Sequence, residues 1–259
     1  MNPLDLWVEH LVSERRPANT IAAARRVARS LPTAATATRE EVEAWWSSRT
    51  HLSPATRSND LALLRTFYAW ARRWEHRDDD PTLRLDAPKV PRGLPRPISR
   101  ADLIRLLSDL PPDLRRAVCL GAYGGLRVSE AAALTWHDVD LETRRIRVLG
   151  KGGKTRLVGM SPLLLDELLP DVGGNVVTAG GAPYSAGTLQ RKVNRAIRAA
   201  GVDATFHQLR HRFGTVALAA TGNLLAVSRA MGHASPATTA IYAATSDADL
   251  DVIADAVTR

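Results

Sequence analysis

The sequence predicts a mainly α-helical fold with a small β-sheet, divided into two domains. Apolar residues recur at helical spacing through residues 1–88, which is typical of a helical bundle. A proline-rich, basic stretch at 89–97 interrupts this pattern and is expected to be an extended linker. Residues 98–259 add alternating apolar residues around one glycine-rich turn, which indicates a second, mainly helical domain with a small sheet.

Three of the four helices of the first domain are expected to begin at a capping pattern. Asn2 precedes a proline and starts a helix over 4–15, followed by an Ala/Arg-rich helix over 18–31. The sequence Thr-Arg-Glu-Glu at 38–41 fits a capping box and starts the third helix. Ser53 precedes a proline and starts a long fourth helix.

Four large apolar residues of the fourth helix follow the spacing i, i+4, i+7 and i+11, which places them on one face. Because this spacing is helical, we expect them to lie in the core of a four-helix bundle rather than to stack on nucleic-acid bases. The four residues are Leu63, Phe67, Trp70 and Trp74.

The second domain is predicted to be helical on both sides of a β-hairpin. Residues 144–149 and 155–160 read as strands joined by the turn Gly-Lys-Gly-Gly-Lys at 150–154. A Ser-Pro pair at 235–236 is expected to cap a short helix that carries Tyr242, and residues 246–257 read as an amphipathic docking helix. The other expected helices are 100–108, 113–123, 126–134, 162–169, 185–200, 207–220 and 223–231.

The composition favours a polyanionic partner. The chain has 259 residues and a net charge of +8, with a pI of about 10.3. The basic excess is spread over both halves, because residues 1–97 hold 16 basic and 12 acidic side chains and residues 98–259 hold 19 and 15. A protein that closes around DNA or RNA fits this pattern, and a generally basic proteome is the alternative.

Several classes of protein are disfavoured. The single cysteine, Cys119, excludes a disulfide framework and a cysteine-rich zinc module, and it suits a reducing cytoplasm. No apolar run approaches the ~20 residues of a membrane span, and the N-terminus lacks the pattern of a signal peptide. We therefore expect a cytoplasmic protein with no membrane partner.

Taken one at a time, the candidate functional residues have ordinary explanations. Arg127 and Glu130 are i, i+3 on a helix and could form a surface ion pair. His207 and His211 are i, i+4, as in some zinc sites, but position 208 is Gln and no third ligand is evident. We expect no metal and no cofactor.

Together, these residues suit phosphate-ester chemistry. Arginine pairs bind the non-bridging oxygens of a phosphodiester and stabilise its pentavalent transition state. Histidine moves protons near neutral pH, and a tyrosine needs nearby cations to become a nucleophile. The second domain contains all of these residue types, and it has no carboxylate cluster suited to two metal ions.

Five segments, in order, resemble the signature segments of the tyrosine recombinase, or phage integrase, family. The spacings also match, with nine residues from His233 to Tyr242 and 24 from Arg127 to Lys151. The resemblance implies a helical core-binding (SAM-like) domain and a tyrosine-recombinase catalytic domain, in the simple two-domain, Xer-like arrangement. The length is expected to leave no room for an arm-site domain. The segments are 123–130, 150–154, 207–211, 232–235 and 241–242.

The resemblance implies a role for each residue of the set. Two arginines would grip the scissile phosphate, a lysine on the hairpin would protonate the leaving 5′-oxygen, and a tyrosine would be the nucleophile. One histidine would handle the tyrosine proton, a second would hydrogen-bond the phosphate, and a glutamate would support the site. In that order, the residues are Arg127, Arg210, Lys151, Tyr242, His207, His233 and Glu130.

The lysines give independent support for a proton donor in the hairpin. Arginine supplies 31 of the 35 basic residues, yet two of the four lysines, Lys151 and Lys154, lie in this one turn. Lysine can release a proton at usable pH, whereas arginine cannot. Lys154 could instead contact phosphate, and further candidates for DNA contact are Arg57, Arg191 and Arg195.

The resemblance implies a site-specific recombinase that cleaves and rejoins double-stranded DNA through a 3′-phosphotyrosyl intermediate and Holliday-junction strand exchange. Its expected partners are an attachment or crossover site, three further copies in a tetramer on two sites, and a directionality factor. The expected location is the nucleoid of a bacterial or phage-infected cell. The alternatives are a type IB topoisomerase and a catalytically silent DNA-binding regulator on the same scaffold.

Overall fold

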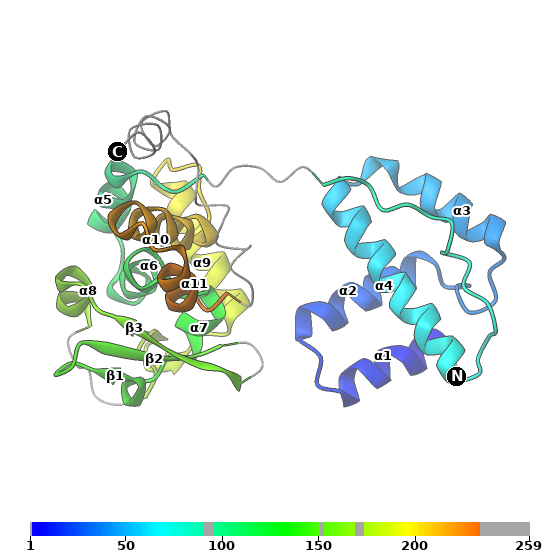
Figure 1. The fold of residues 1–259 in the computed structure, drawn as a ribbon, viewed down its shortest axis with the longest axis horizontal. Coiled ribbons are helices and arrows are strands. Elements are labelled where there is room, and N and C mark those ends of the chain that lie inside the picture. The colour runs from blue at the N-terminus through cyan, green and yellow to red at the C-terminus, as the bar shows by residue number, and fades with distance from the viewer. Residues whose placement is uncertain (1, 91–95, 151–152, 169–173, 234–259) are drawn as a thin grey trace, which may run out of the picture. The chain divides into compact units, whose positions relative to one another are not determined.

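A computed structural model describes residues 2–90, 96–150, 153–168 and 174–233 of the chain. The chain divides into two compact units, Met1–Gly93 and Leu94–Arg259 (Figure 1). In the described part of the chain, no helix is long and apolar enough to cross a membrane. The predicted fold class is confirmed, since helices dominate both units and the only sheets among the described residues are small.

The N-terminal unit contains four α-helices, and three of them, α1, α3 and α4, begin at the expected caps. The side chain of Asn2 accepts a hydrogen bond from the backbone N–H of Leu4. Thr38 and Glu41 form the predicted capping box, and the Ser53 side chain caps the fourth helix. The elements are α1 (Pro3–Ser13), α2 (Ala18–Ser30), α3 (Arg39–Ser48), the 3₁₀ turn η1 (Arg49–His51) and α4 (Pro54–Arg73).

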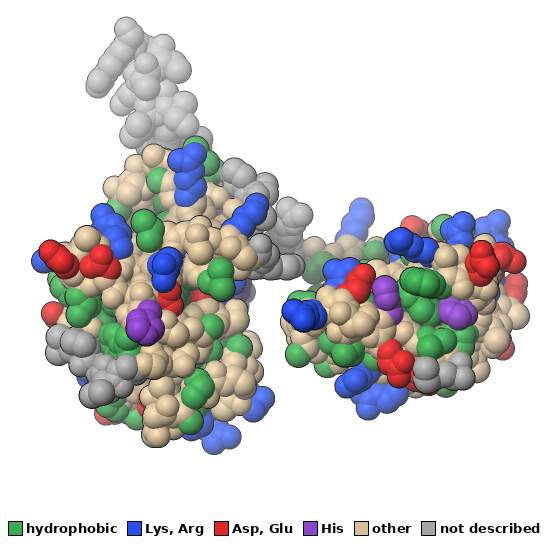
Figure 2. Space-filling model, turned by 90° about the horizontal axis from the view of Figure 1, so that it is seen from below, with side chains coloured by type: hydrophobic (Ala, Val, Ile, Leu, Met, Phe, Trp, Pro, Cys, Tyr) green, Lys and Arg blue, Asp and Glu red, His purple; other side chains and the backbone are tan. Residues whose placement is uncertain are grey.

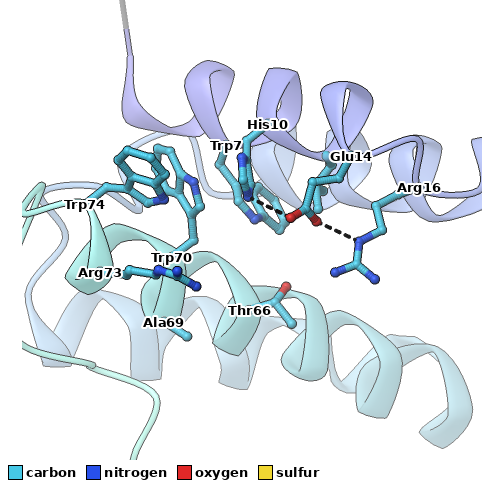
Figure 3. A pocket seen from close by; sticks show the side chains of 10 residues that line it. Trp7, His10, Glu14, Arg16, Thr66, Ala69, Trp70, Arg73 and Trp74 are labelled. Carbon is cyan, nitrogen blue, oxygen red and sulfur yellow. Dashed lines mark hydrogen bonds and ion pairs between the residues drawn. The ribbon is translucent and has the colours of Figure 1, made fainter.

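The apolar face of α4 is rotated relative to the predicted one. Phe67 is fully buried as expected, but Leu63 and Trp70 are only partly buried. Trp74 caps the C-terminal end of α4 and is 55% exposed, so its prediction as a core residue was wrong. Trp74 follows the last residue of α4, and with Trp70 it lines a hollow opposite His10 of α1 (Figure 3). The residues that complete the buried face of α4 are Leu61, Leu64, Tyr68 and Ala71.

A buried carboxylate joins three elements of the N-terminal unit. Asp60 on α4 is fully buried and accepts a hydrogen bond from Arg26 of α2 at 2.5 Å. Arg49 of η1 donates to its other oxygen. A buried charge is tolerated only when it is paired, so these two arginines account for an aspartate in the core.

The C-terminal unit is a helical domain with a three-stranded antiparallel sheet at one side (Figure 1). Each predicted helix up to residue 231 is present, and the predicted strands form β2 and β3. The helices are α5 (Arg100–Ser108), α6 (Pro112–Gly124), α7 (Val128–Ala133), α8 (Pro162–Glu167), α9 (Ala186–Ala199), α10 (Phe206–Thr221) and α11 (Leu224–Met231). The strands are β1 (Val139–Asp140), β2 (Arg145–Leu149), β3 (Thr155–Gly159), β4 (Thr178–Ala179) and β5 (Ala182–Pro183), with a 3₁₀ turn η2 at Trp136–Asp138.

Helix α7 begins two residues later than predicted because the chain reverses at Gly125. This glycine is in the left-handed region, with φ +65°, and a Cβ there would lie 2.5 Å from the ring of Phe213. Leu126 then enters the core, and Arg127, in extended backbone, becomes the N-cap of α7. The turn therefore places Arg127 at the start of α7, two residues after the glycine that packs against Phe213 of α10.

The strand register separates a buried face from an exposed face. Ile146 pairs with Val158 across β2 and β3, and both side chains are buried in the core of the C-terminal unit. Leu149 and Leu157 point to the other face and are mostly exposed. The predictions for the segment 234–259, including the short helix with Tyr242 and the docking helix, lie outside the described residues.

Candidate active site

Four segments that are distant in the sequence meet on one side of the C-terminal unit. They are the N-terminus of α7, the first turns of α10, the end of α11 and strand β3. In the space-filling view, histidine, basic and acidic side chains lie close together on this unit (Figure 2). The site thus collects most of the predicted residues, although their segments are separated by many tens of residues.

Arg127 and Glu130 form more than a surface pair. The backbone N–H of Arg127 donates to Glu130 Oε2 at 2.7 Å, and Arg127 Nη1 donates to Oε1 at 2.8 Å. Arg127 Nη2 also donates to the carbonyl of Gly232 at 3.1 Å. The side chain of Arg127 is 38% exposed, so Arg127 is held by protein contacts while its side chain still reaches solvent.

Arg210 lies beneath this pair and is almost fully buried. Its Nη1 donates to the carbonyl of Gly125 at 2.5 Å, and its Nη2 donates to the carbonyl of Met231 at 2.6 Å. Its Nη1 also lies 3.8 Å from Glu130. Arg210 therefore joins α10 to the turn before α7 and to the end of α11, and it shares a counter-ion with Arg127.

A third arginine, Arg156, was missed by the sequence reasoning. It donates from Nη1 and Nη2 to the two oxygens of Glu130, at 2.9 and 2.8 Å, and from Nε to the carbonyl of Ala230 at 2.8 Å. The signal that could have found it is strand alternation, because Arg156 lies two residues before Val158 and so on the same face of β3.

The site carries excess positive charge around one carboxylate. Burial alone would raise the pKa of Glu130, but hydrogen bonds from Arg156 and Arg127 outweigh it and lower the pKa to about 2. With Arg210 also nearby, three guanidinium groups surround one ionised carboxylate. This arrangement favours an anion such as a phosphodiester in front of Arg127.

The three histidines at the site are shifted towards their neutral form. Burial, followed by the charges of Arg210 and Arg127, lowers the pKa of His233 to about 4. Burial and His207 lower the pKa of His211 to about 4, and burial and Arg210 lower that of His207. Neutral imidazoles can accept a proton or donate a hydrogen bond near pH 7.

The two histidines on α10 pack ring against ring. The rings of His207 and His211 lie 4.2 Å apart, nearly perpendicular to each other. Among the described residues, no group of three or more His, Cys, Asp or Glu side chains is placed to hold a metal ion.

Lys151 and Tyr242 lie outside the described residues, so their roles stay predictions. The other three tyrosines are poor nucleophiles, because burial raises the pKa of Tyr68 and Tyr123 and, with a hydrogen bond to Asp113, raises that of Tyr184 to about 12.

The remaining candidates for DNA contact do not belong to this cluster. Arg57, in the N-terminal unit, stacks on the ring of Trp46 at 4.4 Å. Arg191 donates to Thr188 on α9, and Arg195 and Lys154 are exposed. Their roles in DNA binding stay predictions.

The family model described as "phage integrase family" matches residues 101–249, more than half of the chain. The chain belongs to the phage integrase family. This match covers the whole cluster described above and extends over the segment that contains Tyr242.

Two tyrosine recombinases align with about three quarters of this chain. The tyrosine recombinase XerC of Xanthomonas campestris pv. campestris (strain B100) is 35% identical over 209 residues, which are 75% of this chain and 65% of the relative. The tyrosine recombinase XerD of Xanthomonas axonopodis pv. citri is 35% identical over 225 residues, or 76% of this chain and 74% of the relative. The chain thus spans less than two thirds of the XerC protein.

Solved structures of integrases share the fold. The crystal structure of XerA recombinase is 25% identical, with a TM-score of 0.54 over 99% of this chain and 98% of that chain. The structure of a lambda integrase (75-356) dimer bound to a COC′ core site has a TM-score of 0.76 at 20% identity, with 93% of each chain covered. At 20% identity, the similarity to the lambda integrase structure shows only a shared fold.

Proposed function

We propose that the protein is a tyrosine-type site-specific DNA recombinase. The observation that carries this proposal is the pairing of Arg127 and Arg210 around Glu130, at a site bordered by neutral histidines. Three guanidinium groups facing one carboxylate leave a positive site for a scissile phosphate, and membership of the phage integrase family supports DNA as the substrate.

In the proposed reaction, the phenolic oxygen of Tyr242 attacks the phosphorus of a DNA phosphodiester. The P–O5′ bond breaks, a 3′-phosphotyrosyl link forms, and the 5′-oxygen leaves with a proton from Lys151. Attack by the 5′-hydroxyl of another strand reverses these steps and releases the tyrosine. Because the phosphotyrosyl bond conserves the energy of the broken phosphodiester bond, the reaction needs no external energy source.

The described residues would stabilise this reaction electrostatically. Arg127 would bind the non-bridging oxygens, and Arg210 would add positive charge from below. His207 would take the tyrosine proton, and His233 would donate a hydrogen bond to the phosphate. The lowered pKa values keep both histidines neutral in the DNA-free protein. A neutral His207 can act as the base that accepts the tyrosine proton.

The proposed partners are a double-stranded crossover site and, on two such sites, a tetramer of this chain in a bacterial or phage-infected cell. A lambda integrase dimer bound to a core site and the Tn1549 transposon integrase in complex with transposon right end DNA share the fold. A directionality factor would be a further partner.

A covalent adduct with DNA tests the proposed function. Wild-type protein and the Tyr242→Phe variant are incubated with nicked attachment-site DNA that traps the covalent intermediate, and products are separated under denaturing conditions. We expect an adduct with wild-type protein, none with Tyr242→Phe, and an adduct at the wild-type level with the control Tyr123→Phe.

Three results would redirect the proposal. An adduct with Tyr242→Phe would show that another residue is the nucleophile. Supercoil relaxation without exchange between two sites would favour the type IB topoisomerase alternative. DNA binding with no adduct from wild-type protein would favour the silent regulator.

A further inference from the structure

Arg156 uses all three nitrogens of its guanidinium within the protein. It donates to both oxygens of Glu130 and to the carbonyl of Ala230, and its side chain is only 10% exposed. It therefore has no part in the phosphate contacts proposed for Arg127, and the family resemblance drawn from the sequence gave it no role.

The contacts of Arg156 join three parts of the site. Through Glu130 it reaches the N-terminus of α7, where Arg127 shares the same carboxylate. Through Ala230 it holds the end of α11, and a Cβ on Gly232 would lie 3.0 Å from Arg156 Cδ. Gly232 is thus packed against one arginine while its carbonyl accepts from the other.

The same side chain lies at the base of the hairpin. A Cβ on Gly150 would be 3.8 Å from Arg156 Nη1, and the backbone N–H of Gly150 donates to the carbonyl of Lys154 at 2.8 Å. Gly150 directly precedes Lys151 in the sequence, so the contact lies next to the residue expected to be the proton donor.

We propose that Arg156 is a positioning residue that holds Arg127, the turn before His233 and the base of the Lys151 hairpin in the geometry needed for DNA cleavage. The expected effect of replacing Arg156 on DNA cleavage rests on the proposed function, whereas its expected effect on the local structure does not. This role requires the planar guanidinium of an arginine. A lysine has only one side-chain nitrogen and cannot bind two carboxylate oxygens and a carbonyl in this arrangement.

The first experiment separates DNA binding from cleavage. Arg156→Lys and Arg156→Gln are compared with wild-type protein in single-turnover cleavage at saturating DNA and in equilibrium binding of the same DNA. We expect cleavage to fall about 100-fold in both variants, as for a misplacement of about 1 Å, while the Kd changes less than about threefold.

Arg147 on the neighbouring strand β2 provides the matched control. It is 60% exposed and pairs with Asp138 at 3.1 Å, away from Glu130. Arg147→Gln removes the same charge from the same sheet, so its cleavage rate should stay within about twofold of the wild-type rate, as expected for the loss of an exposed ion pair.

The second experiment needs no DNA. Hydrogen exchange of the whole chain is followed at the amides of Gly232 and His233, which donate to Arg229 and Ser228. In Arg156→Lys and Arg156→Gln, the Ala230 carbonyl loses its hydrogen bond from Arg156. Exchange at these two amides should therefore be at least tenfold faster than in wild-type protein, whereas Arg147→Gln should exchange at the wild-type rate. Arg156→Lys keeps the positive charge, so it serves if Arg156→Gln does not fold.

The outcomes distinguish this proposal from the proposed function. Unchanged exchange at the end of α11 would overturn the positioning role, and so would a loss of cleavage matched by an equal loss of affinity. If wild-type protein formed no adduct with any DNA, the proposed function would fail, while faster exchange in the variants would still support Arg156 as the residue that positions this turn.

Discussion

Glu130 links the charge of the site to the stability of the C-terminal unit. Its pKa of about 2 in the folded protein lies below its ordinary value of 4.5, because the hydrogen bonds from Arg156 and Arg127 outweigh its burial. A lowered pKa stabilises the folded state above pH 4.5, and this contribution disappears as the pH falls towards 2.

We expect Glu130→Gln to reduce the free energy of unfolding at pH 7 by roughly 3 kcal/mol, because the neutral amide loses this interaction. The difference between variant and wild type should narrow as the pH falls below 4.5, which urea unfolding followed by circular dichroism at several pH values would measure. Glu142→Gln, at an exposed position, should match the wild type throughout. A difference independent of pH would point to a packing defect instead.

Two partly buried histidines give a second pH dependence at the level of single residues. His211 and His233 have pKa values of about 4 in the folded protein, below the ordinary 6.5, so their neutral forms are stabilised by folding. Stability from this source is complete above pH 6.5 and is lost as the pH falls towards 4. A bound phosphate would oppose the shift, since an anion favours the charged imidazole.

At the scale of elements, Asp60 fixes α4 against α2 and η1. Removing this carboxylate leaves Arg49 buried without its counter-ion, which typically costs about 3–5 kcal/mol. We expect Asp60→Asn to lower the stability of the N-terminal unit by such an amount. Tryptophan fluorescence during urea unfolding reports this unit, since five of the six tryptophans lie in it.

Asp78→Asn is the control for this prediction, because Asp78 is exposed in the same unit. Its unfolding midpoint should stay at the wild-type value. If Asp60→Asn also behaved as wild type, the buried Arg49 would have to be stable without a carboxylate.

The elements were predictable where local chemistry determines them. The caps at Asn2, Thr38 and Ser53 form as expected, because they depend on residues only a few positions away. The exposure of Trp74 was not predictable from helical spacing, since spacing does not show that α4 ends at Arg73, one residue before it. Strands β4 and β5 have two residues each, too few for an alternating pattern.

The site was predictable only in part for a related reason. Arg127, Glu130, His207 and Arg210 belong to short segments whose order and spacing carry the family resemblance. Arg156 has partners 26 and 74 residues away, so only the folded chain reveals that it binds Glu130 and Ala230.

For the whole molecule, the even spread of positive charge predicts DNA binding with a strong salt dependence. Each half of the chain carries four more basic than acidic residues, divided at residue 97. Neutralised phosphates release counter-ions, so log K should fall with log salt with a slope of about −0.9 per contact in duplex DNA. Fluorescence anisotropy of labelled DNA at increasing NaCl concentrations would measure this slope, and a slope near zero would argue against broad phosphate contacts.

Cys119 gives the molecule a practical property. It is the only cysteine in the sequence, it is buried in the core of the C-terminal unit, and burial raises its pKa to about 12. A thiol reacts as the thiolate, so Cys119 is inert towards alkylating reagents and disulfides while the fold is intact. A cysteine introduced at an exposed position such as Arg195 would then be the one reactive thiol, and it could be cross-linked selectively to DNA that carries a thiol on its backbone.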